Sequence, residues 1–190
     1  MLLFTARMIG HMMHGAALRA AGKFTARPMA FRCWPVDLDV YLHMNNANYL
    51  RVAELSRWKQ MAMTGLVTKS LQEGWMFIIA EQSIRYSKPV NPFQRYSIRS
   101  ELAVDGKWVL YHHYFESASS QKSGERRLFA HIEMRAVVKH VSGKTIQPSE
   151  ILAQVPDLAS WVTPTGPATA GGAGGAAAGA GGGAAAAEEE

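Results

Sequence analysis

The sequence predicts an α+β domain in which one antiparallel sheet wraps round a single long buried helix. Residues 47–63 carry apolar side chains on most faces of a helix, which is typical of a buried helix, and Gly65 offers a stop. Strand-like runs follow, several of them alternating apolar and polar residues with a period of two, at 76–86, 95–104, 108–116 and 128–138. Because a sheet with one apolar face needs a cover, we expect the helix to supply it.

Turn and cap signals set the order of these elements. A short strand is expected at Phe31 to Pro35, and either Asn45 or Asn46 can cap the start of the long helix. Asp105 and Gly106 stand between two strand-like runs and predict a hairpin. The open sheet that results has an edge strand, and pairing of two edges in a homodimer or tetramer would cover it.

Composition divides the chain into three parts. A basic leader is expected at residues 1–28, the folded domain at 29–155 and a Pro/Gly/Ala-rich tail at 156–190. Residues 170–187 are only glycine and alanine, so they have nothing to bury and are expected to be disordered. Roughly 130 residues remain for the domain, which is enough for one hydrophobic core.

The charge of the chain is concentrated in its leader. The first 36 residues contain no acid and five basic residues, namely Arg7, Arg19, Lys23, Arg27 and Arg32. Removing these five from the chain's 20 basic residues leaves 15, equal to the number of acidic residues. The neutral body offers no basic stripe for phosphate backbones, so we do not expect a nucleic-acid partner.

An acid-free leader with spaced arginines that can form an amphipathic helix is typical of a mitochondrial transit peptide. The alternatives are a cytoplasmic protein or a membrane-associated amphipathic segment. The apolar runs of the leader are too short to span a bilayer, so no transmembrane segment is expected. Cys33 is the only cysteine, which excludes an intramolecular disulfide and a cysteine-cluster metal site and favours a reducing compartment.

One motif lies between the first expected strand and the buried helix. It reads Asp39-x-x-x-His43-x-Asn45-Asn46-x-x-Tyr49. A carboxylate close to a helix start is a sound arrangement for hydrolysis of an acyl bond: the carboxylate can activate water or attack directly, and the unpaired amides of the first turn can stabilise the oxygen that gains negative charge.

This motif resembles the hotdog-fold acyl thioesterases of the 4-hydroxybenzoyl-CoA thioesterase type. It is closer still to the Asp-Leu-Asp…His-x-Asn-Asn stretch of plant acyl-carrier-protein thioesterases and of animal thioesterase-superfamily proteins. The order of elements is similar from about Phe31 to Val141, and the specific residues lie within Asp37 to Arg57. The resemblance implies a hotdog fold, a homodimer or larger oligomer, and a site for acyl-CoA or acyl-carrier-protein at the subunit interface.

The resemblance also implies roles for particular residues. Asp39 matches the acidic residue that acts as nucleophile or general base, and the backbone N–H of Asn46 matches the group that polarises the thioester carbonyl. His43 either orients the carboxylate or water or holds the loop, and Asn45 either binds substrate or caps the helix. Tyr49 and Glu54 are further candidates for substrate contact, although a carboxylate on a buried helix also needs a partner of its own.

Asp37 is interpreted as structural, as turn acids commonly are. Tyr41 departs from the plant pattern, which has an asparagine at this position, and its side chain offers no amide to position water. His112 and His113 lie in a strand without a cysteine or acidic cluster at ligand spacing along the chain, so no metal site is expected.

Two functions follow. The first is an acyl-CoA or acyl-carrier-protein thioesterase of lipid metabolism that hydrolyses a fatty-acyl thioester and needs no metal or redox cofactor. The second is a hotdog domain with weak or no catalysis that serves as an acyl-binding or assembly subunit of a larger complex, with which Tyr41 and the basic leader are compatible. A dehydratase is less favoured, because the chain carries no His-centred dehydratase motif.

Overall fold

The computed structural model describes residues 2–23, 28–118 and 126–163. In chain order the elements are α1 (Leu2–Ala20), β1 (Met29–Arg32), the 3-10 helix η1 (Pro35–Asp37), α2 (Asn46–Thr64), α3 (Leu66–Glu73), β2 (Trp75–Tyr86), β3 (Arg95–Asp105), β4 (Trp108–Ser117), β5 (Leu128–His140), β6 (Thr145–Ile146), α4 (Pro148–Gln154) and the 3-10 helix η2 (Pro156–Trp161). The alanine and glycine tract of the expected tail lies outside the described residues.

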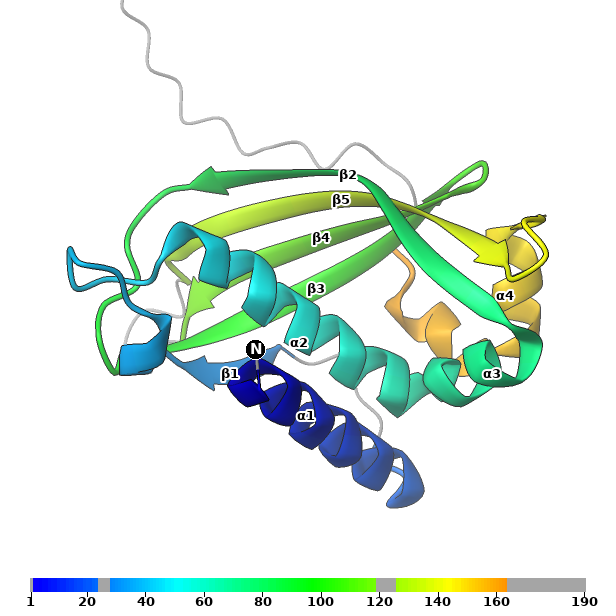
Figure 1. Cartoon of the computed structure of the whole chain (residues 1–190), viewed down its shortest axis with the longest axis horizontal. Coiled ribbons are helices and arrows are strands. Elements are labelled where there is room, and N and C mark those ends of the chain that lie inside the picture. Colours follow the sequence, from blue (N-terminus) through cyan, green and yellow to red (C-terminus); the bar gives the residue numbers. More distant parts are fainter. Residues whose placement is uncertain (1, 24–27, 119–125, 164–190) are drawn as a thin grey trace, which may run out of the picture.

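The sheet is antiparallel throughout and curls round α2 (Figure 1). Its strand order is β1-β3-β4-β5-β2, and β6 pairs with β5 beside this path. Asp105 pairs with Trp108, so Gly106 and Lys107 form the two-residue hairpin loop that the sequence predicts. Gly106 has φ +56°, a left-handed conformation that glycine adopts without strain.

The core lies between α2 and the concave face of the sheet. Val52, Ala53 and Leu55 of α2 are at most 1% exposed, and Ile98, Phe115 and Ile132 of the sheet are buried to the same extent. Gly65 ends the helix with φ +79°, in the left-handed C-cap conformation. The α+β fold with one long buried helix, predicted from the apolar pattern and the strand runs, is confirmed.

The first strand begins earlier than the sequence analysis expected. It spans Met29–Arg32 and not Phe31 to Pro35, because Pro35 opens a 3-10 helix. Proline has no N–H to donate to a sheet ladder, and its fixed φ suits the first position of a helix.

The leader contributes a helix that lies alongside α2 (Figure 1). Gly15 of α1 is buried in this contact, and a Cβ atom added to it would lie 2.5 Å from the backbone oxygen of Lys59. The His11 ring packs 5.3 Å from the Phe31 ring of β1. This docking explains why α2 is apolar nearly all round: the sheet covers one side and α1 covers another.

The described residues continue beyond the domain boundary expected at residue 155. Leu158 and Trp161 of η2 are buried, and Val162 forms a β-bridge with Leu102 of β3. Residues 156–163, which the sequence analysis assigned to the tail, thus include side chains that pack against the domain. No helix in the described ranges is both long and apolar enough to cross a bilayer.

Candidate active site

Asp37 is the anchor of the motif loop. Its side chain is 3% exposed, and its Oδ1 accepts a hydrogen bond of 2.7 Å from Nη1 of Arg7 in α1. Its Oδ2 accepts from the Trp34 N–H at 2.9 Å, and its carbonyl oxygen accepts from the Asn45 N–H at 2.9 Å. The structural role expected for Asp37 is therefore what the structure shows, and a residue of the leader takes part in it.

Asp39 lies on the tight turn that follows. Its Oδ1 accepts from the Tyr41 N–H at 2.9 Å, and its own N–H donates to the carbonyl oxygen of His43 at 3.0 Å. Leu42 closes the turn with φ +59°, a left-handed conformation that a branched side chain seldom adopts. Oδ2 of Asp39 has no hydrogen-bond partner among the described residues, so it is free to meet water or a substrate.

His43 stands beside the carboxylate. Its Nδ1 is 3.6 Å from Oδ1 of Asp39, and its ring stacks on that of Tyr41 with centroids 6.1 Å apart. The His43 side chain is 40% exposed and the Asp39 side chain 21%, so solvent reaches both. The distance is too long for a direct hydrogen bond but allows an electrostatic contact, which suits either role considered for His43.

The start of α2 is capped as the sequence suggests. Asn45 is the N-cap, and its Oδ1 accepts from the Ala47 N–H at 2.9 Å. The N–H of Asn46, the first residue of the helix, has no partner in the described part of the chain, whereas its carbonyl oxygen accepts from the Tyr86 hydroxyl at 3.2 Å. The unpaired amide of Asn46, an exposed residue, thus stands at the positive end of the helix where the loop joins it.

Tyr49 takes a packing position below the loop. It is 2% exposed, and its ring meets those of Tyr86 and Phe115 at centroid distances of 5.2 Å each. Burial raises the pKa of its hydroxyl, and a hydrogen bond with the Val90 backbone opposes that rise. Its side chain supports the loop from the core, where the sequence analysis expected a substrate contact.

Glu54 lies further along α2, at the wall of a cavity. It is eight residues beyond Asn46, or about 12 Å along the helix axis at the usual rise. Its Oε1 accepts from Trp58 Nε1 at 3.4 Å, which supplies the partner that a carboxylate on a buried helix needs.

This cavity has a volume of about 270 Å³. It opens between α2, α3 and the strands β2, β4 and β5, and it is lined mostly by apolar side chains, among them Trp58, Met61, Val67, Trp75, Phe77 and Met134. Arg57 also lines it, and burial lowers the pKa of its guanidinium. Arg57 donates to the Met134 sulfur and forms no ion pair with any described residue.

The structure therefore places Asp39 beside His43 on the loop that leads into α2, and Asn46 begins that helix three residues after His43. Glu54 lies about two turns further along the helix. Two further residues escaped the sequence analysis. Arg7 belongs to the segment that was interpreted as a leader. Arg57 lies on the long helix, where no sequence motif marks it as a functional residue.

Comparison with known proteins identifies the family and the fold of the chain. Residues 33–162 match the model of the thioesterase-like superfamily, so the match begins after α1. Protein THEM6 of Xenopus laevis is 34% identical over 68 residues, which are 36% of this chain and 33% of that protein. The matched segment thus spans about a third of that relative's length.

Solved structures of other proteins share the fold. The YbaW probable thioesterase of Escherichia coli superposes with a TM-score of 0.60 at 21% identity, over 72% of this chain and 98% of that one. A 4-hydroxybenzoyl-CoA thioesterase mutant, complexed with 4-hydroxybenzoyl-CoA, superposes with a TM-score of 0.58 at 14% identity, over 68% of this chain and 97% of that one. At these identities the likeness establishes the hotdog fold. Together with the family match over residues 33–162, it shows that this chain belongs to the thioesterase-like superfamily.

Proposed function

We propose that this protein hydrolyses a fatty-acyl thioester of coenzyme A or of an acyl carrier protein. One observation carries the proposal: Asp39 presents an unpaired carboxylate oxygen on a solvent-accessible turn, directly before a helix whose first amide, that of Asn46, is unpaired as well. A base or nucleophile and an oxyanion donor are the two groups that acyl transfer to water requires.

The chemistry needs only these groups and water. Asp39 takes a proton from water while the water oxygen bonds to the carbonyl carbon, and the Asn46 N–H donates to the carbonyl oxygen as it gains charge. The C–S bond then breaks, the acid departs, and the proton passes to the thiolate. In the covalent variant Asp39 attacks the carbonyl carbon itself, and water hydrolyses the resulting anhydride. His43, 3.6 Å from Asp39, is placed to orient the carboxylate.

The cavity beside α2 is the proposed place for the acyl chain. Its lining is mainly apolar, which favours a hydrocarbon chain, and Glu54 with Arg57 adds polar groups to its wall. An acyl group with a polar far end could meet Arg57, so a dicarboxylic monothioester belongs among the substrates tested.

We propose further that two chains pair through β2. This strand is an edge of the sheet, since it pairs only with β5 in the described residues. It exposes Met76, Ile78 and Ile79 by 43%, 43% and 44%, an apolar edge that a second copy would cover. Light scattering after gel filtration should give a dimer or tetramer mass for the chain and half of that mass for Ile78→Lys. A monomer mass for the unaltered chain would refute the pairing.

The second candidate function is acyl binding or assembly without turnover. Tyr41 favours it, because this side chain is 77% exposed on the loop and has no amide with which to hold a water molecule. Under this alternative, acyl-CoA or a partner protein binds with an affinity that Asp39→Asn leaves unchanged.

Release of free thiol from short, medium, long and dicarboxylic acyl-CoAs separates the two functions. We expect turnover by the full chain, its loss in Asp39→Asn, and full activity in the matched control Asp105→Asn, which changes an exposed hairpin carboxylate. Acyl-carrier-protein thioesters are tested in the same way. Absence of turnover on every thioester, with binding retained, would favour the non-catalytic function, and equal turnover in the two variants would remove Asp39 from the site.

Mitochondrial localisation remains a proposal that rests on the acid-free, arginine-containing leader. Cleavage of the leader on import would also remove Arg7, the ion-pair partner of Asp37. A fluorescent fusion of the full chain should co-localise with mitochondria. A diffuse cytoplasmic signal would refute the proposal.

A further inference from the structure

A cluster of three potential metal ligands lies on the convex face of the sheet. His112 of β4 pairs in register with Glu133 of β5, and His131 lies two residues before Glu133. Because side chains alternate along a strand and partners in register share a face, all three point to the same side. His113, the next residue of β4, is 0% exposed and points the opposite way, into the core beneath α2.

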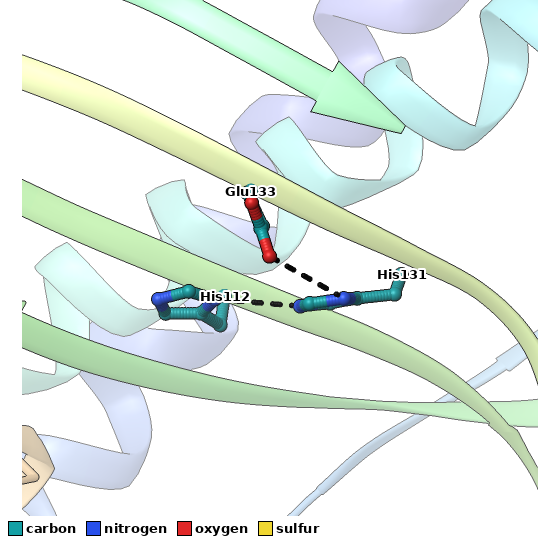
Figure 2. A group of neighbouring side chains, drawn as sticks. All are labelled: His112, His131 and Glu133. Carbon is teal, nitrogen blue, oxygen red and sulfur yellow. Dashed lines mark hydrogen bonds and ion pairs between the residues drawn. The ribbon is translucent and has the colours of Figure 1, made fainter. Parts of the chain in front are cut away.

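The three side chains converge (Figure 2). Nδ1 of His112 is 3.3 Å from Nε2 of His131, and Nδ1 of His131 is 3.8 Å from a carboxylate oxygen of Glu133. One ligand atom from each residue can be chosen so that all lie within 4.8 Å of one another. Without an ion, the two histidines share one hydrogen bond, and the carboxylate is held only by an electrostatic contact.

The spacing of the two ring nitrogens fits a tetrahedral ion. With zinc–nitrogen bonds of about 2.0–2.1 Å and tetrahedral angles, two histidine ligands place their nitrogens about 3.3–3.4 Å apart. The distance between His112 Nδ1 and His131 Nε2 is 3.3 Å. The Glu133 carboxylate faces Nδ1 of His131 and would turn toward Nε2 to become the third ligand, and water would occupy the fourth position.

Neighbouring side chains hold the His131 ring in place and add a carboxylate to the same face of the sheet. Tyr114 stacks on His131 with ring centroids 4.4 Å apart and an interplanar angle of 5°, which holds the imidazole plane. The His131 side chain is 18% exposed and that of Glu133 52%, so an ion can enter from solvent. Glu101 of β3, which pairs in register with His112, places a second carboxylate on this face.

We propose that His112, His131 and Glu133 form a binding site for one divalent transition-metal ion of the zinc type. The ligand set of two imidazoles and one carboxylate is one that zinc accepts. The ion would join β4 to β5 on the face of the sheet opposite α2, and none of its ligands belongs to the Asp39 loop, so the proposal does not depend on the proposed thioesterase activity. Spacing along the chain could not reveal it, because the cluster is assembled by the register of two strands.

Titration of the full chain, with any affinity tag removed, tests the site directly. Calorimetry with ZnCl₂ should give one ion per chain with a dissociation constant in the micromolar range. Co²⁺ should produce visible absorption bands that report tetrahedral coordination. Zn²⁺ should also raise the melting temperature, because the ion binds the folded chain and not the unfolded one.

Variants assign the ligands. His112→Ala and His131→Ala should each weaken binding by at least about tenfold, and Glu133→Gln, which keeps the shape of the side chain, should weaken it as well. His14→Ala, which removes an exposed histidine from α1, is the matched control and should bind as the unaltered chain does. Circular dichroism without metal verifies the fold of each variant. Binding that is absent in the unaltered chain, or that survives in Glu133→Gln and either histidine variant, would overturn the proposal.

Discussion

The ion pair between Arg7 and Asp37 should make α1 a stabilising part of the fold. Breaking an exposed pair costs about 0.2–1 kcal/mol, whereas removing one partner of a buried pair costs about 3–5 kcal/mol. Here the Asp37 side chain is 3% exposed and the Arg7 side chain 24%. Asp37 also keeps the Trp34 N–H as a donor when Arg7 is lost. We therefore expect Arg7→Met to lower the free energy of unfolding by about 2 kcal/mol, between the two limits.

Urea unfolding followed by far-ultraviolet circular dichroism measures this loss. With a slope of about 2 kcal/mol per molar urea, the midpoint should fall by about 1 M. Arg19→Met is the matched control, because Arg19 also lies on α1 and meets Asp157 at 2.6 Å, but those side chains are 45% and 47% exposed. Its loss should stay below about 1 kcal/mol.

A double-mutant cycle with Asp37→Asn isolates the Arg7–Asp37 coupling from other effects of each substitution. The account requires a coupling energy above about 1 kcal/mol. Equal losses in Arg7→Met and Arg19→Met, or a coupling near zero, would refute the view that α1 is anchored through Asp37.

Three further outcomes follow from the structure. Gly15→Ala should destabilise the protein by about 1–3 kcal/mol, because the new Cβ would lie 2.5 Å from the Lys59 oxygen. Gly10→Ala, whose new Cβ would have nothing within 4 Å, should stabilise α1 by up to about 1 kcal/mol, and thermal unfolding compares the two variants. Asn45→Ala should cost about 1 kcal/mol in urea unfolding, because the Ala47 N–H loses its cap, and an unchanged midpoint would contradict the cap. Burial lowers the pKa of His113 from 6.5 to about 3, so the neutral ring contributes stability above pH 6.5 and that contribution is lost as the pH falls. Between pH 7 and pH 5, the free energy of unfolding should drop by about 2 kcal/mol more in the unaltered chain than in His113→Gln.

The long helix and most of the sheet were predictable because their signals are local. Apolar residues on most faces of 47–63 indicate burial on more than one side, and alternation along 128–138 marks β5 before any partner is known. The N-cap at Asn45 and the stop at Gly65 are equally local, since each depends on one residue and its own backbone conformation.

The features that were missed depend on contacts between distant residues. Arg7 meets Asp37 thirty positions away, and composition alone cannot distinguish a helix that docks from a leader that does not. His112 reaches His131 and Glu133 only through the register of β4 with β5, which a one-residue shift would abolish. Tyr49 belongs to the motif, yet it is buried, because a motif does not say which of its residues face the core.

The most direct test of the central claim is kcat/KM for the preferred acyl thioester, measured for the full chain and for Asp39→Asn. Loss of a general base or nucleophile should lower kcat/KM by at least about 100-fold, mainly through kcat, while circular dichroism and oligomeric mass stay unchanged. The same kcat/KM in both proteins would show that the Asp39 carboxylate is not the group that acts on the thioester.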